Sequence, residues 1–145
     1  MTTPNDPIRI DEIPADRLPD IVPLLRVLDP SIAEATLRER VAEMARRGFH
    51  CFGAYDGERL VGCCGAWVLT KYYIGRHVEP DDVVVLPEYR STGVGAALMD
   101  RVHAFGRDNG CAAAELNCYV GNGAGHKFWF NRGYRVIAFH FRREL

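Results

Sequence analysis

The sequence lacks several features that would send the chain to a membrane or out of the cell. Its 145 residues contain no run of about 20 apolar residues, the length that crosses a bilayer. Residues 1–6 lack the basic start and apolar stretch of a secretory signal. No Asn-x-Ser/Thr acceptor for glycosylation occurs. The net charge of −1 gives no global attraction to nucleic acid or anionic lipid. We therefore expect a cytoplasmic protein with no membrane or nucleic-acid partner.

The spacing of the cysteines fits neither a metal site nor a disulfide framework. The five cysteines form no Cys-x-x-Cys pair, and no His/Cys pair has the spacing of zinc ligands. Four of them lie in runs that we predict as strands, and Cys111 just precedes one. We therefore predict reduced, buried thiols that act as small hydrophobes, and no metal site.

What is present is an apolar pattern that predicts a single domain over residues 1–145, with the order β-α-α-β-β-β-α-β-α-β. Helical spacing predicts a helix from near Asp20, and Ser31 with Glu34 matches a capping box at the start of a second helix, which Gly48 ends. Asp56-Gly57 predicts a hairpin whose first arm is the apolar run 49–55. Further strands are predicted at 8–10, 60–69, 77–86, 112–120 and 134–141, with helices after 93 and at 122–132. The predicted fold is α/β, a mixed sheet with helices on both faces.

A strand, a glycine-bearing turn and a helix follow one another between Val83 and Leu98, in the order Val-Val-Val-Leu-Pro-Glu-Tyr-Arg-Ser-Thr-Gly-Val-Gly-Ala-Ala-Leu. A helix start offers unpaired N–H groups and a positive dipole end, which suit an anionic pyrophosphate. Gly93 and Gly95 have no Cβ, so the backbone can approach phosphates closely, and Arg90 adds a positive charge. The Gly-Lys-Ser/Thr of a nucleotide P-loop and the third glycine of a Rossmann fingerprint are absent.

Arg90-x-x-Gly93-x-Gly95 after a Val-x-Pro segment resembles the acetyl-CoA signature of the GNAT N-acetyltransferases. The later Asn122, Phe128, Gly133 and Tyr134 resemble that family's Asn…Phe-Tyr…Gly-Phe pattern in the same register. The resemblance covers nearly the whole chain. It implies the GNAT fold, in which two parallel strands splay apart and acetyl-CoA lies in the opening. It also implies that a small-molecule or peptide amine is the acceptor, and that a homodimer is common.

The resemblance assigns roles to the cofactor-binding segments. The backbone of Val83, Val84 and Val85 would pair with the pantetheine arm. The N–H groups of the turn would hold the pyrophosphate, contributed by Arg90, Ser91, Thr92, Gly93, Val94, Gly95 and Ala96. Asn122 and Phe128, from the later pattern, would complete the cofactor site.

An acidic cluster near the turn supplies candidates for a general base. An alkyl ammonium has a pKa near ~10.4, so it must lose a proton before attacking a thioester. Glu79 precedes Arg90 by 90 − 79 = 11 positions, the offset at which the related histone acetyltransferases carry their base. Asp81 shares its side of a regular strand, Asp82 points the other way, and a bulge would change that assignment. A solvated strand end is the alternative interpretation of these acids.

The family's general acid has no direct counterpart here. Many members carry a tyrosine after the phenylalanine of the later pattern, but this chain has Trp129. Tyr119 is our candidate substitute, with Cys118 as another. Because a thiol leaving group has a pKa around ~8.5, it needs little help from an acid. Trp67, Tyr72 and Tyr73 are candidates for an acceptor pocket, or for ordinary sheet packing. A non-catalytic acyl-CoA-binding or regulatory module remains the alternative function.

Overall fold

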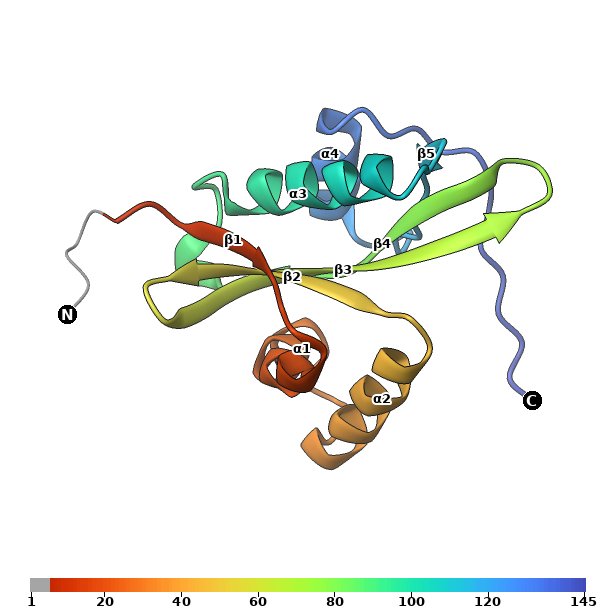
Figure 1. Ribbon diagram of the computed structural model, residues 1–145. Coiled ribbons are helices and arrows are strands. Elements are labelled where there is room, and N and C mark those ends of the chain that lie inside the picture. Colours follow the sequence, from red (N-terminus) through yellow and green to blue (C-terminus); the bar gives the residue numbers. More distant parts are fainter. Residues whose placement is uncertain (1–5) are drawn as a thin grey trace. The chain divides into compact units, whose positions relative to one another are not determined.

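The computed structural model describes residues 6–145, which form two compact units, 6–115 and 116–145. The first unit contains a five-stranded sheet in the order β1-β2-β3-β4-β5 (Figure 1). Neighbouring strands are antiparallel except for β4 and β5, which are parallel. The predicted mixed sheet is therefore confirmed, and so is the parallel pair at its end. The strands are β1 (Arg9–Glu12), β2 (His50–Asp56), β3 (Arg59–Lys71), β4 (Gly75–Val85) and β5 (Ala113–Ala114).

Helices cover both faces of this sheet, as predicted. α1 and α2 lie on one face and α3 on the other (Figure 1). The second unit holds one helix, α4. None of the helices in the described residues is both long enough and apolar enough to cross a membrane. The helices are the 3₁₀ segments η1 (Ala15–Ile21) and η2 (Pro87–Tyr89), with α1 (Val22–Leu28), α2 (Glu34–Arg46), α3 (Val94–Asp108) and α4 (Gly123–Asn131).

Two of the predicted chain reversals have the expected glycine chemistry. Gly57 adopts φ +59° between β2 and β3, at the predicted hairpin. Gly48 adopts φ +93° just after α2, as expected for a helix-ending glycine. The β3–β4 hairpin extends further than predicted, because residues 70, 71, 75 and 76 pair as strand and only 72–74 form the turn.

The first helix begins two residues later than expected, and the prediction was wrong at the start of the second helix. Pro19 lies inside the 3₁₀ segment η1, and regular α-helix begins only at Val22. The capping box does not form, because α2 begins after Ala33 with no side-chain cap. The Ser31 hydroxyl instead donates to the Asp29 carboxylate at 2.5 Å. A local Asx-type turn thus competes successfully for the serine.

The two late strands were also predicted wrongly. Only Ala113 and Ala114 of the expected strand 112–120 pair in the sheet, and residues 134–145 contain no strand. An alternating apolar pattern makes a segment able to pair, but a strand needs a partner edge. In the structure Val136, Phe139 and Phe141 remain exposed.

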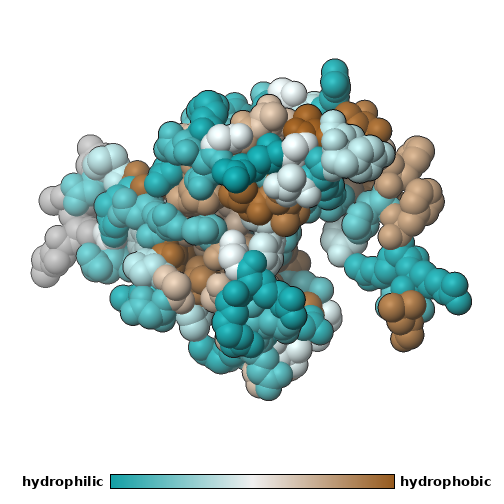
Figure 2. Space-filling view, turned by 45° about the vertical axis from the view of Figure 1, so that its right-hand side comes forward, coloured by the Kyte–Doolittle hydropathy of each residue, from teal (hydrophilic) through white to brown (hydrophobic). Residues whose placement is uncertain are grey.

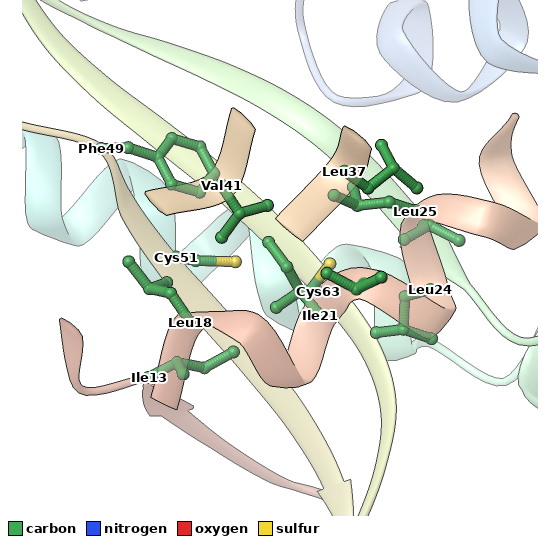
Figure 3. Packing of buried hydrophobic residues seen from close by; sticks show 12 residues of the cluster. Ile13, Leu18, Ile21, Leu24, Leu25, Leu37, Val41, Phe49, Cys51 and Cys63 are labelled. Atoms are coloured by element: carbon green, nitrogen blue, oxygen red, sulfur yellow. The ribbon is translucent and has the colours of Figure 1, made fainter. Parts of the chain in front are cut away.

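The core between the sheet and α1/α2 is built from branched aliphatic residues, two cysteines and Phe49 (Figure 3). Leu37 and Val41 of α2 face Ile21 and Leu25 (Figure 3). The outward side of α2 is charged and hydrophilic (Figure 2). The apolar faces of α1 and α2 therefore pack against one face of the sheet. The candidate site lies where β4 and β5 end.

Cys51, Cys63 and Cys64 are free and buried, as predicted, whereas Cys111 and Cys118 are only half-buried, contrary to the prediction. The pKa of the Cys64 thiol is raised, chiefly by burial. The pKa of the Cys63 thiol is also raised, and a neutral thiol is inert, so Cys63 and Cys64 act as packing groups.

Candidate active site

The parallel strands β4 and β5 separate after two residue pairs. His77 pairs with Ala113 and Val78 with Ala114, and the Glu115 amide donates to the Val78 carbonyl at 3.0 Å. Beyond this point β4 continues to Val85 along β3, while no described residue extends β5 as a strand beside it. Within residues 6–115, residues 79–85 therefore have a main-chain edge with no strand paired to it, in keeping with the predicted splay. An extended ligand with amide groups can pair with such an edge.

A bulge interrupts β4 within this edge. Gly65 pairs with Asp81 and Cys63 with Val84, so two residues of β4, Asp82 and Val83, lie opposite the single residue Cys64. Asp82 has φ +50°, an uncommon value for a residue other than glycine. The bulge reverses the alternation of side chains that follow it. Val84 consequently joins the core cluster under α1 and α2, and Val85 lies beside Gly62 and Leu98.

The turn after β4 has the geometry of an anion cradle. Gly93 caps α3 in the left-handed conformation, with φ +90°, and an added Cβ would meet no atom within 4 Å. Among the described residues, the amides of Ser91, Thr92 and Gly93 have no main-chain acceptor. The first amides of α3 have no acceptor within the helix either. Free N–H groups therefore meet open space at the positive end of α3.

Arg90 braces the junction between strand and turn. Its amide donates to the Pro87 carbonyl at 3.2 Å, so this N–H is already bonded. Its Nε donates to the Val85 carbonyl at 3.0 Å. The exposed guanidinium still has its terminal N–H groups to offer an anion. The Thr92 hydroxyl donates to the Tyr89 carbonyl at 2.5 Å, which further stiffens the turn.

Glu79 and Asp81 lie on the same face of β4, as predicted. Glu79 pairs with Trp67 of β3, and the Trp67 indole Nε1 donates to Asp81 Oδ2 at 3.1 Å. Trp67 also packs on the Phe49 ring, with centroids 5.1 Å apart. One Asp81 oxygen is thus occupied by indole and the other accepts from the Asp82 amide. Glu79 keeps a side chain that is 21% exposed.

The Asp82 carboxyl has a pKa well above its ordinary value. Burial, followed by the negative charge of Asp81, raises the pKa of its carboxyl to about 6. It stands at the bulge, so the sequence-based assignment of its side-chain direction from a regular strand does not apply there.

Three predicted site residues belong to residues 116–145 and are described within that unit. Asn122 caps α4, where its Oδ1 accepts from the Gly125 amide at 2.9 Å. Phe128 packs edge-on against Trp129, and Trp129 against Tyr134. The Tyr119 side chain is 79% exposed, and its carbonyl accepts from His126 Nε2. Their roles toward cofactor and thiol stay predictions.

Two residues that sequence reasoning missed meet beside Glu79. His77 precedes it on the same face of β4, and Glu115 follows the short strand β5. Only the parallel pairing of segments 36 residues apart brings them together, from 113 − 77. The one available signal was His77 itself, a polar residue two positions before the proposed base in a run of strand residues.

Comparison with known families agrees with this geometry. The model of the acetyltransferase (GNAT) family matches residues 18–134. That match spans strands β2 to β5, the glycine turn and α4. The chain therefore belongs to the GNAT acetyltransferase family.

Particular relatives define the fold further. Thialysine N-epsilon-acetyltransferase from Sus scrofa is 29% identical over 76 residues, which are 47% of this chain and 45% of that protein. The chain thus matches about half the length of this curated relative. An acetyltransferase from Trypanosoma brucei has a TM-score of 0.76 and 24% identity, covering 96% of this chain and 100% of that chain. An aminoglycoside N-acetyltransferase in complex with CoA has a TM-score of 0.81 and 20% identity, covering 97% and 99%. These structures share the fold.

Proposed function

We propose that the protein transfers the acetyl group of acetyl-CoA to a primary amine. The observation that carries this proposal is the open edge of β4, which leads directly into the unbonded amides before α3. The edge of residues 83–85 would pair with the pantetheine amides. The amides of residues 91–96, with the Arg90 guanidinium, would hold the pyrophosphate. Relatives named for thialysine and aminoglycoside acetylation support an amine acceptor.

Glu79 is the proposed base. Its carboxylate takes a proton from the acceptor ammonium, directly or through one water, and leaves the nitrogen lone pair free. The amine then attacks the thioester carbonyl, a C–N bond forms, and the C–S bond breaks as thiolate departs. A main-chain N–H on the open edge near Val85 would stabilise the oxyanion. Tyr119 is the proposed donor of the proton to the thiolate.

The proposal is tested by measuring free thiol released from acetyl-CoA with panels of amines and peptides. Glu79→Gln should lower kcat by about 10²-fold or more while leaving cofactor affinity almost unchanged. Glu58→Gln, at the exposed β2–β3 turn, is the matched control and should retain full activity. A fully active Glu79→Gln variant would transfer the role to Asp81, Asp82 or water. CoA binding without thiol release from any acceptor would favour the non-catalytic module.

A further inference from the structure

His77 is the buried polar group for which the mechanism above has no use. Its side chain is fully buried, and Nε2 has no hydrogen-bond partner in the structure. A buried polar atom without a hydrogen-bond partner destabilises the folded state, so the presence of His77 in this strand requires a reason.

Two carboxylates flank this nitrogen. Nε2 lies 3.9 Å from Glu79 Oε2 and 4.0 Å from Glu115 Oε2. The side chain of Glu79 is 21% exposed and that of Glu115 is 18% exposed, whereas the imidazole is fully buried. Among the described residues no set of three or more His, Cys, Asp or Glu side chains is arranged to hold a metal ion. The imidazole of His77 lies between the two carboxylates by these distances.

The contact of the other ring nitrogen, Nδ1, indicates where the imidazole of His77 carries its protons. Nδ1 lies 3.4 Å from the Gly75 carbonyl oxygen, and a carbonyl only accepts. A proton on Nδ1 alone would leave the Nε2 lone pair facing two negative carboxylates. A second proton, on Nε2, turns the same geometry into an imidazolium with two acceptors. Each gap is about 1 Å longer than a hydrogen bond, so a small rotation of either glutamate closes it.

We propose that His77 is a positioning residue for Glu79, an imidazolium whose Nε2–H is shared between the carboxylates of Glu79 and Glu115. This inference rests on the proposed role of Glu79 as base. Glu115 is itself held, because the Tyr73 hydroxyl donates to its Oε2 at 2.5 Å. When Glu79 accepts a proton from the amine, it loses its charge and the imidazolium stays paired with Glu115. The neutral carboxyl group of Glu79 then separates from His77. It returns to the imidazolium once it has lost the proton, ready for the next turnover.

Imidazole ¹⁵N spectra of the intact protein at pH 7 test the geometry without any acceptor. The His77 signal is assigned by its loss in His77→Gln. We expect Nε2 to be protonated, and its resonance to move in both Glu79→Gln and Glu115→Gln. Glu12→Gln, which removes the partner of His50, is the control and should leave it in place. An unprotonated Nε2, or one that ignores both glutamates, overturns the proposal even if acetyl transfer is found.

Kinetics separate a positioning role from a merely structural one. We expect His77→Leu to lower kcat by about 10- to 100-fold with little change in the KM for acetyl-CoA, as for a misaimed base. His77→Gln, which keeps a donor, should recover part of the loss. In a Glu79→Gln background His77→Leu should have almost no further effect. An equal loss in both backgrounds contradicts positioning. If the leucine variant does not fold, Glu115→Gln supplies the same cycle.

Discussion

At the residue scale, Asp82 is placed where its charge is unfavourable. It sits at the bulge of β4, and burial together with Asp81 raises its pKa to about 6. The ordinary value for such a carboxyl is 3.8. Because the pKa is higher in the folded state, Asp82 favours folding below pH 4, and this contribution disappears as the pH rises through 6. At neutral pH the ionised carboxylate costs stability.

We therefore expect Asp82→Asn to stabilise the protein at pH 7.5 but not at pH 4. Asparagine has the same shape, keeps no charge and tolerates positive φ. One pKa unit corresponds to about 1.4 kcal/mol, so removing a carboxyl whose pKa rises from 3.8 to about 6 should raise the free energy of unfolding by up to about 3 kcal/mol at the higher pH. Chemical denaturation at both pH values is the measurement. Asp100→Asn, on an exposed carboxyl of α3, is the control. An equal gain at the two pH values would contradict this account.

At the element scale, β3 and β4 approach each other through glycine. A Cβ at Gly65 would lie 2.3 Å from the Phe49 ring and 3.0 Å from the Asp81 carbonyl. Phe49 in turn supports Trp67, which bonds Asp81. The close approach thus positions the acidic edge of β4.

Gly65→Ala should destabilise the protein by about 1–3 kcal/mol, the usual cost of overpacking. Gly121→Ala is the control, because a Cβ there meets nothing within 4 Å. Thermal unfolding of the two variants compares them directly. If Gly65→Ala unfolds at the wild-type temperature, the ring of Phe49 must move aside at no cost, and the packing argument fails.

The turn before α3 makes a second prediction at this scale. Gly93→Glu or Gly95→Glu should abolish CoA binding, because a carboxylate would occupy the proposed pyrophosphate seat. Gly93→Ala separates the two effects, since it introduces backbone strain at φ +90° without a charge. It should lower stability and still bind CoA. Calorimetric titration with CoA is the readout, and tight binding by either glutamate variant would refute the assigned cradle.

On the scale of the whole molecule, binding at the turn should stabilise the native state. Coenzyme at 100 times its Kd should add about 2.7 kcal/mol to the free energy of unfolding. Thermal unfolding with CoA should therefore shift upward, and ATP should give a smaller shift because it cannot use the open edge of β4. A larger shift with ATP would point to a mononucleotide site.

The turns and helix ends that depend on a few neighbouring residues could be predicted from the sequence. Gly48, Asp56-Gly57 and the Arg90–Gly95 motif act through their own backbone, so their positions were visible in the sequence. Ser31 misled because Asp29 competes for its hydroxyl, a choice decided by three-dimensional geometry. The segment 134–141 misled because alternation shows capacity to pair and not the presence of a partner edge. His77 and Glu115 meet only through a long-range strand pairing, which no local pattern encodes.

The extra residue in β4 also determines which mutations the strand can accept. The bulge, in which two residues stand against Cys64, decides which layer of the protein Val84 enters and which Val85 enters. Deleting Asp82 would reverse the two side chains, so that Val84 would point away from α1 and α2. The direction in which the chain enters the glycine turn would change as well. Position 82 should therefore accept replacements that tolerate its φ of +50°, such as asparagine or glycine, but no shortening of the chain.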